Sequence, residues 1–310
     1  MAPPASIAGA GVARVLSIQS HVVHGYVGNK AAVFPLQVLG VEVDAINSVQ
    51  FSCHTGYPLF TGQVLQGDAL WELVRGLEGN KLLEYTHLLT GYIGSASVLR
   101  TVLRTLTAIR QVSPDAAYLC DPVLGDGGKL YAPAELVSIY KDEVVPLATM
   151  LTPNQFEAEL LTDITIATES DAFAACEHLH AKGVHTVVIT SAHLDEPQAQ
   201  GSITLLASRR QAAEGSAAGS RPSRYRIDIP KIESTFTGTG DLTAALLLAW
   251  THRLGEDALA QALENTVASV QAVLKRTCEE GRADRELCLV QSVADVTNPS
   301  VQLRVRARTV

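Results

Sequence analysis

The sequence predicts an α/β protein with a mainly parallel central sheet, helices on both faces of that sheet and a few edge strands. Short apolar runs alternate with longer amphipathic stretches between residues 13 and 192. This order is typical of parallel strands that are joined by crossover helices. Polar residues follow the apolar runs, as they do where the strands of such a sheet end at a binding site. The composition, 47% hydrophobic and 18% charged, is that of a folded globular chain.

The first part of the chain alternates strand and helix. Strands are expected at 13–20, 41–47, 85–94 and 116–122, where apolar residues form compact runs or alternate with polar ones. Helices are expected at 28–40, 68–79 and 95–112, where apolar residues recur at helical spacing. The stretch 51–63 is rich in aromatic and turn-forming residues and predicts a loop or flap.

The second part continues the alternation and ends in antiparallel strands. Helices are expected at 133–146, 155–161, 169–182, 238–252 and 255–276, and strands at 148–154 and 185–192. The stretches 202–208 and 224–230 predict a hairpin, whose low-complexity connection 209–223 is expected to be a mobile surface loop. The tail stretches 285–292 and 301–309 alternate enough to predict edge strands.

No change in composition marks an interdomain linker, so residues 13–310 are expected to form a single domain behind a flexible N-terminal tail, residues 1–12. That tail lacks the features of a signal peptide, and no stretch approaches a transmembrane span. The five cysteines form no CxxC pair, which argues against a zinc site or a disulfide framework. We therefore expect a cytoplasmic protein that contacts no membrane.

Charge and motifs exclude several classes of function. The net charge is −8 and no cluster of Lys and Arg is present, so no nucleic-acid partner is expected. Gly25 and Gly28 belong to neither GxGxxG nor GxxxxGK[ST], which leaves a Rossmann dehydrogenase and a P-loop kinase poorly supported. His21, His24 and His54 are scattered and are expected to face solvent rather than bind zinc.

Asp241 lies between a Gly-Thr-Gly turn and an apolar helical stretch. An acid in the first turn of a helix can simply cap it. A cap, however, does not need Gly238 and Gly240 beside it, whereas glycines let backbone amides approach a ligand at a helix N-terminus. The stretch therefore indicates a base next to a phosphate.

Further polar residues occur at the predicted carboxyl ends of the strands. Parallel strands end at one edge of a sheet, so these side chains should converge. They are Ser20, Tyr92, Asp121, Thr152, Asn154, Thr190 and Ser191.

Two acids and a capping motif are candidates for cation and nucleotide binding. Asp121 and Asp126 flank a turn after a strand, where carboxylates can bind cations that accompany a nucleotide. Asn154 and Glu157 have the spacing of an ordinary capping box, which the spacing alone favours. They could equally lie beside a metal–phosphate unit, and the two interpretations are compatible.

Seven stretches in order resemble the ribokinase superfamily and, within it, the pyridoxal kinase (vitamin B6 kinase) family. They are LSIQSHVVHGYVGNKAAVFPLQVLG, VDAINSVQFSCHTGY, LLTGYIGS, CDPVLGD, LTPNQFEAELL, VVITS and GTGDLTAALLLAW, and the resemblance covers nearly the whole chain from about residue 15. Related hydroxymethylpyrimidine-type kinases carry a cysteine after Gly-Thr-Gly; Asp241 at that place favours the pyridoxal kinase branch.

The resemblance implies a ribokinase-like fold and ATP-dependent phosphorylation of the 5′-hydroxymethyl group of pyridoxal, pyridoxine and pyridoxamine. It implies that Asp241 is the base, with the amides of Gly238, Thr239 and Gly240 as the anion hole. It implies further roles for residues that match the family: Ser20, Thr55 and Tyr92, with Asp241, bind the vitamer; Asp126 binds Mg²⁺; Asp121, Thr152 and Thr190 bind a monovalent cation such as K⁺ or Na⁺; Asp121, Asn154, Glu157, Thr190, Ser191, Ile232, Glu233, Ser234, Thr239 and Gly240 bind ATP. A homodimer is also implied.

Alternatives remain open at this stage. The chain could be another ribokinase-type kinase, acting on hydroxymethylpyrimidine or a nucleoside, or a non-catalytic pyridoxal-phosphate carrier, against which the intact Asp241 argues. The segment 126–131 is shorter than in animal relatives, and the 209–223 loop is idiosyncratic. These departures predict differences in lid closure over ATP and in access of the adenine.

Overall fold

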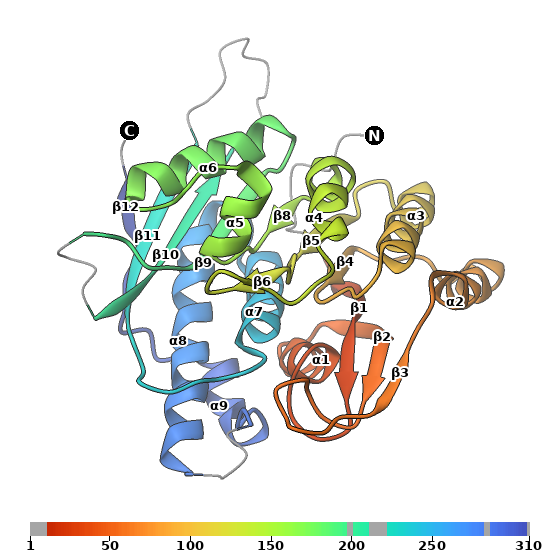
Figure 1. Ribbon diagram of the computed structural model, residues 1–310, viewed down its shortest axis with the longest axis horizontal. Coiled ribbons are helices and arrows are strands. Elements are labelled where there is room, and N and C mark those ends of the chain that lie inside the picture. The colour runs from red at the N-terminus through yellow and green to blue at the C-terminus, as the bar shows by residue number, and fades with distance from the viewer. Residues whose placement is uncertain (1–10, 197–200, 211–221, 282–285, 309–310) are drawn as a thin grey trace.

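The computed structural model describes residues 11–196, 201–210, 222–281 and 286–308. In this part of the chain, the main sheet has ten strands in the order β12-β11-β10-β9-β8-β5-β4-β1-β2-β3 (Figure 1). The six strands of its middle are parallel: β1 (Arg14–Val22), β2 (Glu42–Phe51), β4 (His87–Thr90), β5 (Ala117–Cys120), β8 (Met150–Leu151) and β9 (Thr186–Ala192). The mainly parallel sheet expected from the sequence is thus confirmed.

Antiparallel strands complete both ends of the sheet. At one end, β3 (Gly62–Val64) pairs with β2. At the other end, β10 (Ser202–Arg209), β11 (Ser223–Pro230) and β12 (Arg306–Arg308) follow β9. A separate hairpin of β6 (Gly125–Asp126) and β7 (Lys129–Leu130) contains most of the short segment 126–131.

Helices cover both faces of the sheet, because successive side chains of a strand point to opposite faces. Leu16 and Val187 face one buried cluster, whereas Val15 and Val188 face the other. The first cluster packs against α2 (Gly67–Gly79), α3 (Ala96–Val112), α4 (Glu135–Ile139), α5 (Gln155–Thr162) and α6 (Glu169–Ala181). The second packs against α1 (Asn29–Val38), α7 (Thr239–Leu254), α8 (Leu259–Glu279) and α9 (Val293–Thr297).

Helix α7 is the most deeply buried helix of the second face. Every residue from Ala244 to Thr251 is buried, because its sequence is apolar around the whole circumference and not on one stripe. It contacts both α1 and α8. The helix begins directly after Gly238, so Asp241 lies in the first turn of a helix that the core fixes on all sides.

Most expected elements are confirmed, but two are not. The stretch 285–292 forms no strand in its described residues 286–292: Glu286 to Leu289 are buried one after another, and a 3₁₀ turn follows at Val290–Ser292. Consecutive burial means that the segment is surrounded on all sides, whereas an edge strand alternates between core and solvent. The helix expected at 133–146 is broken into α4, a π-helical turn at Tyr140–Val144 and a 3₁₀ turn at Val145–Leu147. Pro146 lies in that 3₁₀ turn and has no N–H to donate to an α-helical carbonyl, which weakens a regular helix at this point.

Two expectations fall largely outside the described residues. These are the flexible tail 1–12, of which residues 11–12 are described, and the mobile loop 209–223, of which residues 211–221 are not described. The expected hairpin itself is confirmed by the antiparallel pairing of β10 with β11. The expected strand at 301–309 is confirmed in part by the short β12.

The antiparallel end of the sheet contains a buried ion-pair network. The Arg226 side chain is fully buried, and its guanidinium donates to Glu169 at 2.6 Å, Glu196 at 2.7 Å and Asp228 at 2.8 Å. Arg308 Nε from β12 forms an ion pair with the other oxygen of Glu169, at 2.8 Å. The network therefore joins β11 and β12 to the start of α6.

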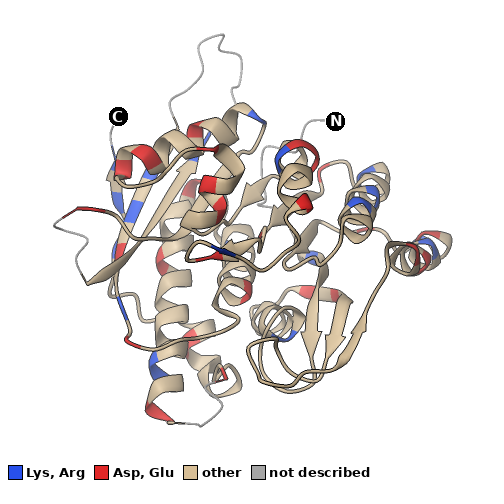
Figure 2. Cartoon of the chain, viewed as in Figure 1, with Lys and Arg blue, Asp and Glu red and all other residues tan. Residues whose placement is uncertain are grey.

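Charged residues of both signs are interspersed over the described helices and strands (Figure 2). None of the helices in the described ranges combines the length and the apolar character that crossing a bilayer requires.

Candidate active site

Segments that follow three of the parallel strands meet at the first turn of α7. Gly28, which precedes α1, donates its N–H to Asp241 Oδ2 at 2.8 Å. A Cβ on Gly91, one residue after β4, would lie 3.1 Å from Asp241 Oδ1, and a Cβ on Gly240 would lie 3.2 Å from Asp121 Oδ2. Three segments that follow β1, β4 and β5 are thus within contact distance of the first turn of α7.

The carboxylate of Asp241 has one occupied and one unoccupied oxygen. Oδ2 accepts the Gly28 N–H, whereas Oδ1 faces Gly91 and has no hydrogen-bond partner among the described residues. Burial raises the pKa of Asp241 to about 6, and the Gly28 hydrogen bond opposes this shift. A carboxylate whose pKa approaches neutrality is a stronger proton acceptor than a solvated one.

Two glycines are required by close backbone contacts around Asp241. Gly238 has φ +85°, and a Cβ there would collide with the carbonyl oxygen of Tyr26. Gly28 has φ +53°, and a Cβ there would collide with the carbonyl of Ser20. L-residues with side chains rarely adopt such φ values, so both turns depend on glycine. The N-terminus of α7, with its free N–H groups, opens directly beyond Gly238.

Asp121 and Thr152 directly follow the neighbouring strands β5 and β8, whereas Thr190, which was expected at a strand end, lies within β9. Asp121 is 5% exposed and Thr152 is 3% exposed, and the Thr190 N–H donates to Pro153 O at 2.9 Å. Burial raises the pKa of Asp121 well above its usual range, and the nearby Glu157 and Asp241 carboxylates add to this shift. The buried hydroxyl oxygen of Thr152 has no hydrogen-bond partner among the described residues. Buried polar atoms without a partner are rare and indicate a missing ligand or water.

Asn154 and Glu157 form the capping box that their spacing predicts. Asn154 Oδ1 accepts the Glu157 N–H at 2.9 Å, and Glu157 Oε2 accepts the Asn154 N–H at 2.9 Å. Glu157 Oε1 also accepts the N–H of Leu124 at 2.8 Å and that of Gly125 at 3.3 Å. Burial raises the pKa of Glu157 to about 7, and these backbone donors oppose the shift. The pair therefore fixes the turn that carries Asp126.

Asp126 lies on the exposed β6–β7 hairpin and accepts the Gly127 N–H at 2.8 Å. No group of three or more His, Cys, Asp and Glu side chains in the described ranges is arranged to hold a metal ion. An Mg²⁺ site with few protein ligands relies on water and substrate phosphates for the others.

The expected vitamer-binding residues differ in their surroundings. Ser20 lies at a register shift between β1 and β2 and contacts Gly28. Bulges of this kind often re-aim a side chain beside an active site. Tyr92 follows Gly91 and is partly buried, and burial raises the pKa of its hydroxyl. Thr55 is exposed in the loop between β2 and β3.

Residues 231–238 connect β11 to α7 and contain three of the residues expected to bind ATP, Ile232, Glu233 and Ser234. Glu233 is exposed and lies 4.0 Å from Lys231, the Ser234 N–H donates to Ile232 O at 2.7 Å, and Ile232 packs against the second core cluster. Ser191 lies within β9. Within the described ranges, no hydrogen bond or ion pair joins residues 232–234 to the carboxylates at the strand ends.

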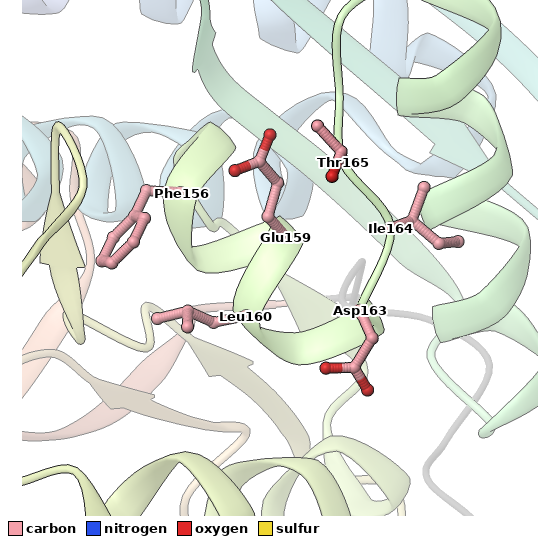
Figure 3. A pocket seen from close by; sticks show the side chains of 6 residues that line it. All are labelled: Phe156, Glu159, Leu160, Asp163, Ile164 and Thr165. Carbon is pink, nitrogen blue, oxygen red and sulfur yellow. The ribbon is translucent and has the colours of Figure 1, made fainter.

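A separate open pocket of about 300 Å³ lies on the outer side of α5 (Figure 3). Its lining residues are Phe156, Glu159, Leu160, Asp163, Ile164 and Thr165. Glu159 accepts the Ile166 N–H at 2.8 Å, and Asp163 pairs with Lys141 at 2.7 Å. None of the expected site residues lines this pocket, and its acids are already paired, so the strand-end site is the better candidate.

Three contributions to the site are not apparent from motifs. Gly28 was expected to belong to neither GxGxxG nor GxxxxGK[ST] and was given no role of its own, yet its amide contacts the Asp241 carboxylate from 213 residues away in the sequence. Glu286 is buried and contacts the loops beside the site. His54 was expected to face solvent, but its side chain is only 19% exposed and lies 3.4 Å from Glu286. A buried acid in an otherwise apolar stretch, RELCLV, is the signal that could have identified Glu286.

A parallel sheet with a Gly-Thr-Gly-Asp turn at its carboxyl edge defines a ribokinase-type small-molecule kinase. Residues 83–287 match the model of the phosphomethylpyrimidine kinase family. A pyridoxal kinase of Arabidopsis thaliana is 52% identical over 299 residues, which cover 94% of this chain and 93% of that protein. A pyridoxal kinase of Homo sapiens is 46% identical over 303 residues, covering 93% and 96%. The chain belongs to the pyridoxal kinase family.

Solved structures agree with this assignment. The structure of pyridoxal kinase from Leishmania donovani in complex with ADP and ginkgotoxin is similar, with a TM-score of 0.87 and 38% identity over 96% of this chain and 99% of that one. The complex of the same enzyme with ADP and pyridoxine has a TM-score of 0.86 and 37% identity over the same shares. The ribokinase-like fold is therefore confirmed.

Proposed function

We propose that this chain transfers the γ-phosphoryl group of ATP to the 5′-hydroxymethyl oxygen of pyridoxal, pyridoxine and pyridoxamine. The observation that carries the proposal is the Asp241 carboxylate, which Gly28 fixes through Oδ2 while Oδ1 lies beside Gly91 with no hydrogen-bond partner among the described residues. Relatives that share about half of the sequence are pyridoxal kinases, and the Leishmania enzyme has been solved with ADP together with pyridoxine or pyridoxamine.

In the proposed reaction, Asp241 Oδ1 accepts the proton of the vitamer hydroxyl. The hydroxyl oxygen forms a bond to the γ-phosphorus, the bond from that phosphorus to the bridging oxygen breaks, and ADP leaves. Phosphoryl transfer depends mainly on alignment and charge stabilisation. The N–H groups of Gly238, Thr239 and Gly240 at the start of α7 would stabilise the oxygens of the transferred group, at about 3 kcal/mol for a well-placed donor.

The cations belong to the proposal as well. Mg²⁺ would bind ATP phosphates together with Asp126, a ligand set that suits an ion that retains several waters. K⁺ or Na⁺ would lie near Asp121, Thr152 and Thr190, where buried carboxylate charge and the partnerless Thr152 hydroxyl provide oxygen donors. Bound cations supply charge that offsets the carboxylates and the polyphosphate. Asn154, Glu157, Ser191 and residues 232–234 would border the ATP.

A homodimer and a cytoplasmic location are further proposals, supported by the resemblance to pyridoxal kinases and by the sequence composition. The short β6–β7 hairpin supports the proposal that lid closure over ATP differs from that of animal relatives.

The test is ATP-dependent turnover of a panel that contains the three vitamers, hydroxymethylpyrimidine and nucleosides. We expect the three vitamers to be phosphorylated with a higher kcat/KM than hydroxymethylpyrimidine or the nucleosides. Hydroxymethylpyrimidine is the second candidate, because the matching family model is that of phosphomethylpyrimidine kinase. No turnover of any vitamer by a folded protein with ATP and Mg²⁺ would refute the proposal.

A further inference from the structure

Glu286 is a buried carboxylate outside the residues that the motifs identify. It is 3% exposed and begins the buried segment 286–289 beside α8, where Cys288 N donates to Thr277 Oγ1 at 3.1 Å. An ionised carboxylate in the interior is unfavourable unless hydrogen-bond donors satisfy its oxygens. The groups that donate hydrogen bonds to Glu286 therefore indicate its structural role.

The donors to Glu286 come from two loops that are distant in sequence. The Tyr26 N–H donates to Oε2 at 2.9 Å, and the Tyr57 hydroxyl donates to Oε1 at 3.0 Å. His54 Nε2 lies 3.4 Å from the same Oε1. One carboxylate thus connects the loop before α1 with the loop at residues 52–61, between β2 and β3.

The hydrogen bonding of His54 defines which of its ring nitrogens faces Glu286 with a proton. The Gly56 N–H donates to His54 Nδ1 at 3.1 Å, so Nδ1 carries a lone pair. The ring proton of the neutral imidazole is then on Nε2, which faces Glu286. The His54 and Tyr57 rings also contact each other, with centroids 4.7 Å apart. The 52–61 loop therefore presents to Glu286 a packed pair of rings, of which the Tyr57 hydroxyl donates a hydrogen bond and His54 Nε2 lies beside the same oxygen.

Each loop contributes to the proposed site. Thr55 lies between His54 and Gly56 in the 52–61 loop. In the other loop, the carbonyl of Tyr26 packs against Gly238, and the Gly28 N–H contacts Asp241. Glu286 is therefore connected to both the vitamer-binding loop and the segment that orients the base.

We propose that Glu286 is a positioning residue that fixes the 52–61 loop relative to Asp241. This inference deepens the proposed function and rests on it, because the vitamer contact of Thr55 is itself proposed. The reacting hydroxyl must lie within hydrogen-bond reach of Asp241, and a displacement of about 1 Å can reduce the rate about 100-fold. A vitamer that is held by a displaced loop would bind weakly and out of line with the base.

Glu286→Gln tests the inference, because glutamine keeps the size of the side chain but has one acceptor oxygen instead of two. Its NH₂ group would face the N–H of Tyr26 or the donors of the 52–61 loop. We expect the KM for pyridoxal to rise about tenfold or more, kcat to change less, and the KM for ATP to stay within about twofold of the wild-type value. Hydrogen–deuterium exchange in residues 52–61 should also become faster. An unchanged pyridoxal KM in the folded variant would overturn the inference.

Tyr57→Phe provides a second test that keeps the carboxylate. It removes one donor and should raise the KM for pyridoxal by a smaller factor. Residues that act through one contact are not additive, so the double variant Tyr57→Phe/Glu286→Gln should show less than the product of the two single effects. If the double variant shows the full product of the two single effects on the pyridoxal KM, the inference is overturned. If Glu286→Gln fails to fold, an unchanged pyridoxal KM in Tyr57→Phe overturns it instead.

Glu264→Gln is the matched control. Glu264 is also buried, at 9% exposed, and accepts a backbone N–H from Val305 at 2.9 Å, but it pairs with Arg304 and not with either loop. This variant should lose stability without a change in the pyridoxal KM. A wild-type protein that turns over no vitamer would refute the proposed function. An active wild type whose Glu286 and Glu264 variants have the same pyridoxal KM would refute only the role of Glu286.

Discussion

Asp241 combines a hydrogen bond to one oxygen with an unpaired second oxygen. The Gly28 N–H orients Oδ2, whereas Oδ1 lies beside Gly91 with no hydrogen-bond partner among the described residues. A proposed base in this arrangement needs no rearrangement of its own side chain before it accepts a proton.

The first prediction concerns Asp241→Asn. Asparagine retains the shape of the side chain and an acceptor for the Gly28 N–H, but it cannot take up the proton. We expect kcat to fall by about 10²–10⁴-fold, with little change in the melting temperature or in ATP affinity. If Asp241 only caps α7, asparagine will serve equally well and kcat will stay near the wild-type value.

The second prediction concerns pH. Because burial raises the pKa of Asp241 to about 6, kcat/KM for pyridoxal should fall as the pH drops below about 6, where the proposed base becomes protonated. Stability should respond in the opposite direction. The folded protein favours the neutral carboxyl, so the contribution of Asp241 to stability is complete below its unfolded pKa of 3.8 and is lost as the pH rises through about 6.

Activity and melting temperature measured against pH, for the wild type and Asp241→Asn, check this prediction. In the Asp241→Asn variant, the fall of kcat/KM at low pH that protonation of Asp241 causes should be absent. An identical acid limb in both proteins would assign it to another group, such as the substrate.

At this scale, the sequence predicted the carboxylate but not its partner. Asp241 is recognisable because the glycines and the helix it begins are adjacent to it in the sequence. The Gly28 amide has no side chain to mark it, and only the fold brings it to Asp241. Likewise, the contacts of Glu286 depend on two loops whose shapes no local pattern specifies.

At the scale of elements, the protein has two capping boxes, one beside the candidate site and one away from it. Comparing them distinguishes an effect on helix stability from an effect on the site. Asn154 with Glu157 begins α5 beside the site, and Thr168 with Asp171 begins α6 away from it. In addition to its cap, Asn154 donates from Nδ2 to Gly125 O at 2.7 Å. The first box therefore also supports the turn that leads to Asp126, whereas the second has no such contact to that turn.

The third prediction compares Asn154→Ala with Thr168→Ala. Each variant loses a cap and should be destabilised by about 1 kcal/mol, measured by denaturant unfolding. Only Asn154→Ala should also raise the KM for ATP, because the turn that carries Asp126 loses a contact. Equal ATP kinetics in the two variants would show that the first box is structural only.

Sequence patterns predicted most elements because strands and helices bury different spacings of apolar residues. The two failures have different causes. Residues 286–289 are buried one after another, and full enclosure removes the alternation between core and solvent on which such patterns depend. In the stretch 140–147, Pro146 lies in a 3₁₀ turn and has no N–H to donate to an α-helical carbonyl. The π-helical turn at Tyr140–Val144 has no spacing of its own in the sequence.

At the scale of the whole molecule, the parallel order of the strands sets the position of the site. Segments that follow β1, β4 and β5 lie within contact distance of the first turn of α7, and Asp121 is the predicted strand-end residue that these contacts include. The direction of the strands, which alternating strands and helices imply, was sufficient to predict this edge of the sheet as the place of the candidate site.

The fourth prediction concerns the cation. The chain has a net charge of −8, and its site contains several carboxylates that would repel the phosphates of ATP. Turnover should therefore be abolished by excess chelator and restored by Mg²⁺. Substantial turnover in the presence of the chelator would contradict the proposed Mg²⁺ requirement.

The fifth prediction concerns the antiparallel end of the sheet. Arg226→Ala leaves Glu169, Glu196 and Asp228 without their shared partner, and loss of one member of a buried ion pair typically costs about 3–5 kcal/mol. Arg75→Ala is the control, because Arg75 is 60% exposed in its pair with Glu72 and should contribute no more than about 0.5 kcal/mol. Urea unfolding of both variants checks the difference; similar losses of stability would contradict it.

The burial of α7 has a consequence for how such an enzyme can change during evolution. The proposed base is carried by a helix whose residues from Ala244 to Thr251 are all enclosed, so a substitution that re-aims the base also disturbs the interior. Loops such as 52–61 lie at the surface and can vary without that penalty. Divergence in substrate choice should therefore accumulate in the loops, while the chemical step stays the same across relatives that accept different alcohols.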